Sequence, residues 1–270
     1  MSDPFGAADA RPWISVPGEH DDKYSRGVAG FVTGSDRYPG AAVLGVEAAL
    51  HTGVGMVRYL GPGRATRLVL QRRPEAVTAA GRVQAWVLGS GQDAADRDPA
   101  TAALLDRALG QDVPTVIDSG ALDSIGRATG PVVITPHAGE LATLLGVDRA
   151  TVQGDPDAAA ERAAADLGVT VLLKGHRSVI ATGDGTRHHV EAPTAWLATA
   201  GSGDALAGVL GALLATHAAA IEADRGILAE LAATACLLHG RAGERAGAGG
   251  PFTVTDLCEQ LPAAVTELLS

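Results

Sequence analysis

The sequence predicts an α/β protein in which helices cover both faces of a mostly parallel sheet. Short runs of β-branched residues alternate with longer segments rich in alanine and leucine along most of the 270 residues. This alternation is typical of parallel strands joined by helices, and such sheets are normally covered on both faces. Hydrophobic residues make up 46% of the chain and charged residues 19%, a composition that supports a full core and excludes disorder.

The expected elements follow one another in a regular order. We expect strands over residues 28–32, 55–60, 85–88, 115–117, 132–135, 169–174, 179–182 and 188–191. We expect helices over residues 39–51, 99–109, 139–145 and 157–167, and almost continuously after Gly203. The turn at residues 183–185 predicts that the last two strands form an antiparallel pair toward one edge. No long linker interrupts this order, so residues 1–270 are expected to form a single domain, with residues 1–24 as a flexible N-terminal extension.

Charge and cysteine content limit the classes of partner. The chain has 21 basic and 31 acidic side chains, a formal net charge of −10. Binders of nucleic acids and anionic membranes carry a basic surface, so we expect neither as a partner. The N-terminus resembles no export signal, and the longest apolar stretch, residues 205–220, is a little short to span a bilayer. Two cysteines suggest a reducing compartment, so a cytoplasmic protein is expected.

The strongest local signal is a glycine-rich turn that leads directly into a helix, the segment LATAGSGDALAG over residues 197–208. Backbone N–H groups at the start of a helix can converge on an anion, and glycines let the backbone approach it. Asp204 in this segment has two possible roles. It can cap the helix, or it can act as a general base beside a bound phosphoryl group.

A second candidate is the turn formed by Lys174, Gly175, His176, Arg177 and Ser178, which follows a strand. Lys174 is one of only two lysines in the chain. The turn can be a hairpin with a solvated lysine. It can also be a phosphate clamp made by the Lys174 ammonium, the Gly175 amide and the Ser178 hydroxyl. It is not a Walker A loop, because the Gly-x-x-x-x-Gly-Lys-Ser/Thr pattern is absent.

Four further strand ends carry glycines or polar side chains, at residues 38–42, 88–91, 118–122 and 135–140. Because the carboxyl ends of parallel strands meet at one edge of a sheet, these strand ends predict a shared ligand site there. His137, in the last of them, can equally be an ordinary residue at a helix N-terminus. The sequence has no metal-ligand spacing, no Gly-x-Ser-x-Gly elbow and no Gly-x-Gly-x-x-Gly fingerprint.

Taken in order, six segments resemble one family. They are PGAA, VLG-x-G, VIDSGAL, VITPHAGEL, VLLKGHRSVIATGDG and LATAGSGDALAG, and they resemble the ADP-dependent NAD(P)H-hydrate dehydratases of the ribokinase-like superfamily. The resemblance extends over roughly residues 25–265. It implies a ribokinase-like three-layer fold and, from the length of the chain, a stand-alone dehydratase without the epimerase domain that is often fused to it.

The resemblance also implies a reaction. The S-epimer of hydrated NADH or NADPH, which carries a hydroxyl at C6 of the nicotinamide ring, is dehydrated to NADH or NADPH. ADP is the phosphoryl donor and co-substrate, and AMP and phosphate are released. Mg²⁺ is expected with the ADP phosphates, although no residue can be named as its ligand. The family also suggests a homo-oligomer, a tetramer.

Roles follow for the matching positions. Asp204 would activate the C6 hydroxyl, and the amides of Gly201, Ser202 and Gly203 would stabilise the transferring phosphoryl group. Lys174, Gly175, His176, Arg177 and Ser178 would hold the nucleotide phosphates. Ala41, Gly91 and His137 match positions that contact the hydrated dinucleotide, together with Asp204.

Two loops depart from the pattern of the family. Residues 89–93 read GSGQD in place of Gly-Pro-Gly-x-Gly, and DSGAL replaces a DADAL-like stretch, so that Gly120 stands in place of a carboxylate. Two alternatives therefore stay open. One is a ribokinase-like, ATP-dependent small-molecule kinase of the hydroxymethylpyrimidine or thiazole kinase type, and the other is an inactive nucleotide-binding homologue.

Overall fold

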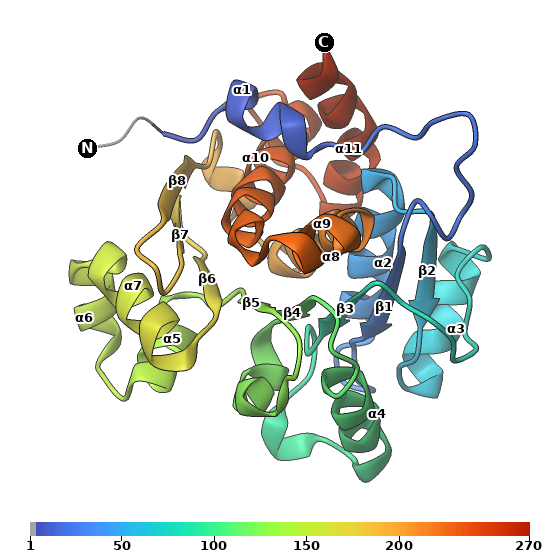
Figure 1. Cartoon of the computed structure of the whole chain (residues 1–270), viewed down its shortest axis with the longest axis horizontal. Coiled ribbons are helices and arrows are strands. Elements are labelled where there is room, and N and C mark those ends of the chain that lie inside the picture. Colours follow the sequence, from blue (N-terminus) through green and yellow to red (C-terminus); the bar gives the residue numbers. More distant parts are fainter. Residues whose placement is uncertain (1–3) are drawn as a thin grey trace.

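One eight-stranded sheet forms the middle layer of the structure, a computed structural model that describes residues 4–270 (Figure 1). The order of strands across the sheet is β2-β1-β3-β4-β5-β6-β7-β8. The strands are β1 (Val28–Val32), β2 (Met56–Tyr59), β3 (Ala85–Leu88), β4 (Thr115–Ile117), β5 (Val132–Ile134), β6 (Thr170–Leu173), β7 (Arg177–Ala181) and β8 (Arg187–Glu191). Every strand expected from the sequence is present, with ends that differ by at most two residues.

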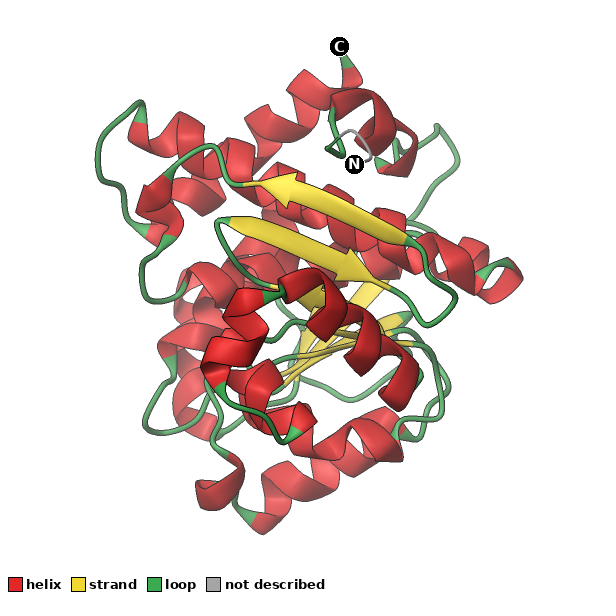
Figure 2. Cartoon of the chain, turned by 90° about the vertical axis from the view of Figure 1, so that its left-hand side faces the viewer, coloured by secondary structure: helices red, strands yellow, loops and turns green. Residues whose placement is uncertain are grey.

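The sheet changes from parallel to antiparallel at β6. Strands β1 to β6 pair in parallel, whereas β7 pairs antiparallel with both β6 and β8. Figure 2 shows β7 and β8 as a long antiparallel pair at the edge. Strand β7 begins at Arg177, two residues earlier than expected, because Arg177 and Ser178 already pair with Glu191 and Val190 of β8. The turn after Lys174 is correspondingly shorter.

Helices cover both faces of the sheet, as predicted (Figure 1). One face is covered by α1 (Ala7–Ala10), α2 (Gly40–Thr52), α3 (Gly63–Arg72), α8 (Ser202–Thr216), α9 (Ala218–Ala223), α10 (Leu228–Gly247) and α11 (Val254–Leu269). The other face is covered by α4 (Pro99–Leu109), α5 (Ala138–Leu145), α6 (Arg149–Gly154), α7 (Pro156–Leu167) and the 3₁₀ helix Ser119–Arg127. Side chains alternate between the two cores along a strand, as Phe31 and Val32 of β1 do.

Close backbone contact between α2 and α8 fixes where α8 begins. A Cβ atom on Gly208 would overlap the backbone of Gly45, and one on Gly45 would lie 3.4 Å from the carbonyl oxygen of Asp204. Glycine at both positions therefore lets the two helices touch along their backbones. This contact places the N-terminus of α8 beside the start of α2.

The N-terminal segment packs on the core instead of extending from it. The Phe5 N–H donates to the His189 carbonyl oxygen of β8 (3.0 Å). Phe5, Ala10 and Ile14 are buried in the core on the face of the sheet that α8 and α10 cover. The prediction that residues 1–24 form a flexible extension is therefore wrong for the segment around α1, because this segment packs against α10 and α11. Residues 1–3 lie outside the described part of the chain. Within that part, no helix is both long and apolar enough to cross a membrane.

Candidate active site

A cavity of about 610 Å³ opens at the carboxyl edge of the sheet, between the ends of β5, β6 and β8 and the helices α8 and α10. Parallel strands present their carboxyl ends to this edge, where ligands of open α/β sheets gather. Of the predicted site residues, His137, Lys174, Gly175, His176, Ser178, Ser202 and Gly203 line the cavity. The structure therefore brings together three segments that are well separated in the sequence.

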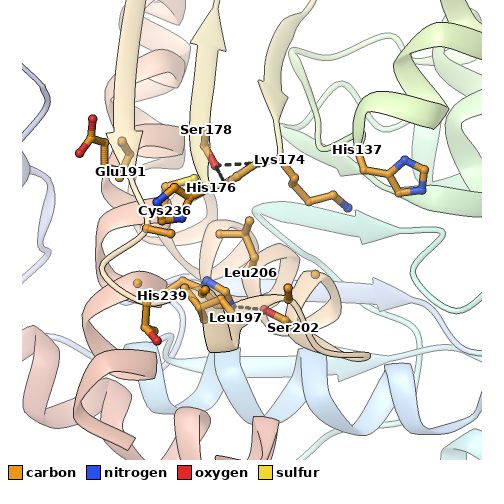
Figure 3. Close-up of a pocket in the computed structure, with 18 of the residues that line it drawn as sticks. His137, Lys174, His176, Ser178, Glu191, Leu197, Ser202, Leu206, Cys236 and His239 are labelled. Carbon is orange, nitrogen blue, oxygen red and sulfur yellow. Dashed lines mark hydrogen bonds between the residues drawn. The ribbon is translucent and has the colours of Figure 1, made fainter. Parts of the chain in front are cut away.

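The cavity has an apolar part and a polar end (Figure 3). Val190, Leu197, Leu206 and Cys236 contribute apolar walls, while Lys174 lies toward the α8 N-terminus. Burial raises the pKa of the Cys236 thiol to about 12, so this side chain is a neutral part of the wall. Such a cavity suits a flat heterocyclic base with a charged group attached to one end.

The N-terminus of α8 supplies backbone donors at the polar end. Gly201 has φ of +92°, a left-handed conformation that favours glycine, and Ser202 begins the helix. The Ser202 hydroxyl lies 3.2 Å from Nε2 of His239 on α10. Burial lowers the pKa of His239 to about 4, so the imidazole is neutral near pH 7. Free N–H groups at a helix N-terminus are able to bind an anion.

Asp118 is the centre of the polar network behind the cavity. Its carboxylate accepts hydrogen bonds from Ser90 Oγ (2.9 Å), Thr135 Oγ1 (2.8 Å) and Lys174 Nζ (2.8 Å). The residue is 1% exposed, and the ion pair with Lys174 joins the ends of β4 and β6. The ammonium of Lys174 also lies close to α8, since a Cβ on Gly203 would be 3.3 Å from Nζ. Lys174 is therefore not a solvated hairpin lysine.

The charges of this network shift two pKa values upward. Burial, together with the charge of Asp118, raises the pKa of Asp204 to about 6, while Lys174 acts in the opposite direction. Burial alone would lower the pKa of Lys174, but the carboxylates of Asp118, Glu140 and Asp204 outweigh it and raise the pKa above its usual value. A carboxylate with a pKa near 6 is a stronger base than an ordinary aspartate, while Lys174 stays charged.

His137 combines a structural position with an accessible imidazole. Its Nδ1 accepts hydrogen bonds from the N–H groups of Gly139 (3.0 Å) and Glu140 (3.1 Å), which caps α5. The Glu140 carboxylate accepts in return from the His137 N–H (2.8 Å). Because Nδ1 is used as an acceptor, the neutral ring carries its proton on Nε2. The side chain is 61% exposed and lines the cavity, so capping and ligand contact are compatible.

Ala41 and Gly91 meet beside this site without lining the cavity itself. Gly91 has φ of +67°, and a Cβ atom there would overlap that of Ala41 at the start of α2. The two unusual loops also touch each other, because a Cβ on Gly120 would overlap the backbone of Gln92. Glycine at position 120 and the GSGQD loop are thus matched in shape, and a carboxylate at 120 would require this loop to move.

Not every predicted residue lies on the cavity. Arg177 extends to the other face of the sheet, where its guanidinium is 3.5 Å from Asp157 of α7, so nothing supports nucleotide binding by its side chain. Asp204 and Gly201 flank the lining residues Ser202 and Gly203. Sequence reasoning did not select Asp118 or His239 as site residues. Asp118 carried a weak signal as a polar strand end, whereas His239 lies in a helix with no motif.

Among residues 4–270, no group of three or more His, Cys, Asp or Glu side chains is arranged to hold a metal ion. Mg²⁺ is commonly held by substrate phosphates with few protein ligands and several waters. A magnesium ion that enters with nucleotide phosphates would need few ligands from these residues.

Comparison with known proteins places the chain in a family. Residues 29–262 match the family described as NAD(P)H-hydrate dehydratase. The bifunctional NAD(P)H-hydrate repair enzyme Nnr of Mycobacterium tuberculosis is 46% identical over 225 residues, which are 78% of this chain and 46% of that protein. The chain thus spans about half the length of the curated relatives that it matches first. The ADP-dependent (S)-NAD(P)H-hydrate dehydratase of Neisseria meningitidis is 35% identical over 84% of this chain and 79% of its own length.

Solved structures agree with the sequence relatives. The ADP/ATP-dependent NAD(P)H-hydrate dehydratase of Bacillus subtilis, co-crystallised with ATP and Mg²⁺, superposes with a TM-score of 0.85, 26% identity and 99% coverage of both chains. A ribokinase-like superfamily protein of Enterococcus faecalis, at 23% identity, has a TM-score of 0.82 over 97% of this chain and 95% of its own, and shows the shared fold alone. The predicted ribokinase-like α/β fold is confirmed, and the chain belongs to the NAD(P)H-hydrate dehydratase family.

Proposed function

We propose that this protein dehydrates the S-epimer of hydrated NADH or NADPH to NADH or NADPH, with ADP as the phosphoryl donor. The observation that carries the proposal is Asp204, whose pKa is raised to about 6 at the N-terminus of α8, beside Lys174 and a cavity large enough for a nucleotide. A base of this strength next to an anion-binding helix terminus suits the transfer of a phosphoryl group to a hydroxyl. Membership of the family adds support.

The apolar part of the cavity would hold the adenine, and its polar end the phosphates. Lys174, Gly175 and Ser178 line this cavity together with Ser202 and Gly203, the first residues of α8. ADP would enter with Mg²⁺ on its phosphates. The α8 amides would then meet the β-phosphoryl group and stabilise negative charge on its oxygens during transfer.

The reaction would proceed in two steps. Asp204 takes the proton of the C6 hydroxyl while the oxygen attacks the β-phosphorus of ADP, and the bond to AMP breaks. The phosphate is a better leaving group than hydroxide. The C6–O bond then breaks with the help of the ring nitrogen lone pair, a proton is lost from C5, and the dihydropyridine is restored. Ala41, Gly91 and His137 would contact the hydrated dinucleotide beside this centre.

The test is recovery of the absorbance of reduced nicotinamide. Purified protein is incubated with enzymatically hydrated NADH in three parallel reactions, which contain ADP, ATP or no nucleotide. Recovery with ADP is expected. Recovery of the absorbance with ATP alone would show that ATP, and not ADP, is the donor. Transfer of phosphate to a small alcohol, without recovery of the absorbance, would favour the kinase alternative. Nucleotide binding without any turnover would favour an inactive homologue.

We also propose a homotetramer that acts in the cytoplasm. Family membership supports the assembly, and Trp196, which is 50% exposed beside Phe252 and Pro251, offers an apolar contact surface. The two free, buried cysteines Cys236 and Cys258 fit a reducing compartment. Light scattering on the eluting protein measures the assembly, and a monomer would contradict the proposal.

A further inference from the structure

The buried carboxylate of Asp118 ties together the ends of four neighbouring strands. Asp118 follows β4, and its hydrogen-bond donors Ser90, Thr135 and Lys174 follow β3, β5 and β6. Ser90 and Thr135 are each 1% exposed. The carboxylate is therefore held by three donors in a region from which water is largely excluded, where charge-assisted hydrogen bonds are strong.

The backbone around Asp118 adopts conformations that are costly for other residues. Ser119, the next residue, has φ of +43°, which is unusual for serine. Gly89 has φ of +95°, and a Cβ atom there would overlap the carbonyl oxygen of Asp118. Strained backbone persists where the surrounding structure requires a particular placement, and it is common at functional sites. Here it places one carboxylate behind Lys174.

Two carboxylates act on the same ammonium group. Asp118 accepts a hydrogen bond from Lys174 Nζ, while Asp204 lies near enough for its charge to raise the pKa of Lys174. An ammonium has three N–H donors, and the bond to Asp118 leaves the others free for a phosphate. Without Asp118, the remaining carboxylates that act on the ammonium are Glu140 and Asp204. Because Nζ already lies beside Gly203 at the α8 N-terminus, Asp204 would be its partner there.

We propose that Asp118 is a positioning residue, which holds the Lys174 ammonium beside the N-terminus of α8 and keeps it from pairing with Asp204. Asp204 then remains available to accept the proton of the substrate hydroxyl, and Lys174 remains available to the phosphoryl group. This inference rests on the proposed function. It adds a role to a residue that neither contacts the cavity nor reacts.

The charges around Asp204 fix the direction in which each substitution should shift the pH profile of kcat/KM. The charges that act on Asp204 are Asp118 after β4, which raises its pKa, and Lys174 after β6, which lowers it. Glu140 of α5 acts on Lys174, and Lys174 acts on the neutral His239 of α10. Activity requires the deprotonated base, so kcat/KM should rise with pH through the pKa of Asp204. Neutralising Asp118 should move this rise to lower pH, and neutralising Lys174 should move it to higher pH.

The experiment compares the pH profiles of kcat/KM for hydrated NADH, at saturating ADP, in four proteins. They are the wild type, Asp118→Asn, Lys174→Met and the double variant. In Asp118→Asn the rise should shift down by about 1 pH unit, and kcat should fall by about 10²-fold because Lys174 is misplaced. In Lys174→Met the rise should shift up. Asp166→Asn, an exposed substitution on α7, is the control and should match the wild type.

The double variant keeps the test decisive if Asp118→Asn alone does not fold. It has no unpaired buried ammonium, and its rise should lie at lower pH than that of Lys174→Met. Because both of these variants lack Lys174, a positioning role predicts the same maximal kcat for them. A double variant with a kcat well below that of Lys174→Met, or an Asp118→Asn profile at the wild-type pH with only a lower Tm, would overturn the inference. An inactive wild type would instead contradict the proposed function, so the two failures are distinguishable.

Discussion

Replacing Asp204 by asparagine should make the protein more stable and far less active. The carboxyl has a pKa of about 6 in the fold against an ordinary value of 3.8, mainly because it is buried. A shift of about two units, at about 1.36 kcal/mol per unit, corresponds to about 3 kcal/mol. Because the pKa is higher in the fold, the protonated carboxyl favours the fold at low pH. This contribution is lost as pH rises through about 6.

The expected gain from Asp204→Asn is therefore about 2–3 kcal/mol at pH 8 and falls toward zero near pH 4. At about 2–4 °C per kcal/mol for a chain of this size, the Tm should rise by roughly 4–12 °C at pH 8. Differential scanning calorimetry at both pH values measures it, with Asp166→Asn as the control. The kcat should fall by about 10²–10⁴-fold. If the gain in stability over the wild type were no larger at pH 8 than at pH 4, the explanation from burial would be refuted. Normal turnover by Asp204→Asn would show that Asp204 is not the base.

Three further predictions follow from the site and its support. Gly91→Ala should raise KM for hydrated NADH about tenfold or more, since the new methyl overlaps Ala41; an unchanged KM in steady-state assays would exclude contact there. His137→Asn should keep the cap of α5 and the free energy of unfolding, whereas His137→Ala should lose about 1 kcal/mol of it, as measured by urea unfolding. Equal stability of the two variants would contradict the capping role. Burial alone would raise the pKa of Glu47, but hydrogen bonds from Arg73 and a second arginine hold it below its usual value. Glu47→Gln should therefore cost about 3 kcal/mol near pH 7. The cost should shrink as pH falls below the ordinary pKa of glutamate toward the lowered pKa of Glu47, and a pH-independent loss would refute the ion-pair explanation.

The positions of the strands along the chain could be predicted from the sequence because each strand is short, apolar and bounded by glycine or polar residues. Burial on both faces makes such strands nearly continuous apolar runs. Helix α3 was not expected, because its segment is rich in arginine and buries only Ala65 and Val69. The N-terminal segment was misjudged for a related reason. Its few apolar side chains become informative only when the surfaces of α10 and α11 are known.

The site was predictable in its segments but not in its contacts. Lys174 was identified as one of two lysines, placed at a strand end, and Asp204 by the glycine-rich turn that begins its helix. The resemblance to a family then favoured the site role over the ordinary alternative at each position. The ion pair between Lys174 and Asp118 depends on the alignment of β4, β5 and β6, which local sequence does not specify. Arg177 was expected in the turn, but it belongs to β7, so its side chain follows the alternation of that strand and points toward α7. The proximity of Gly120 to Gln92 is visible only in three dimensions.

The most direct test of the proposed reaction is a product balance. The wild-type protein is incubated with hydrated NADH and ADP, and reduced nicotinamide, AMP and inorganic phosphate are quantified together by chromatography. The three products should appear in equal amounts, and Asp204→Asn should suppress all three in parallel. Formation of AMP and phosphate without recovery of NADH, or recovery of NADH without consumption of ADP, would contradict ADP-driven dehydration at this site.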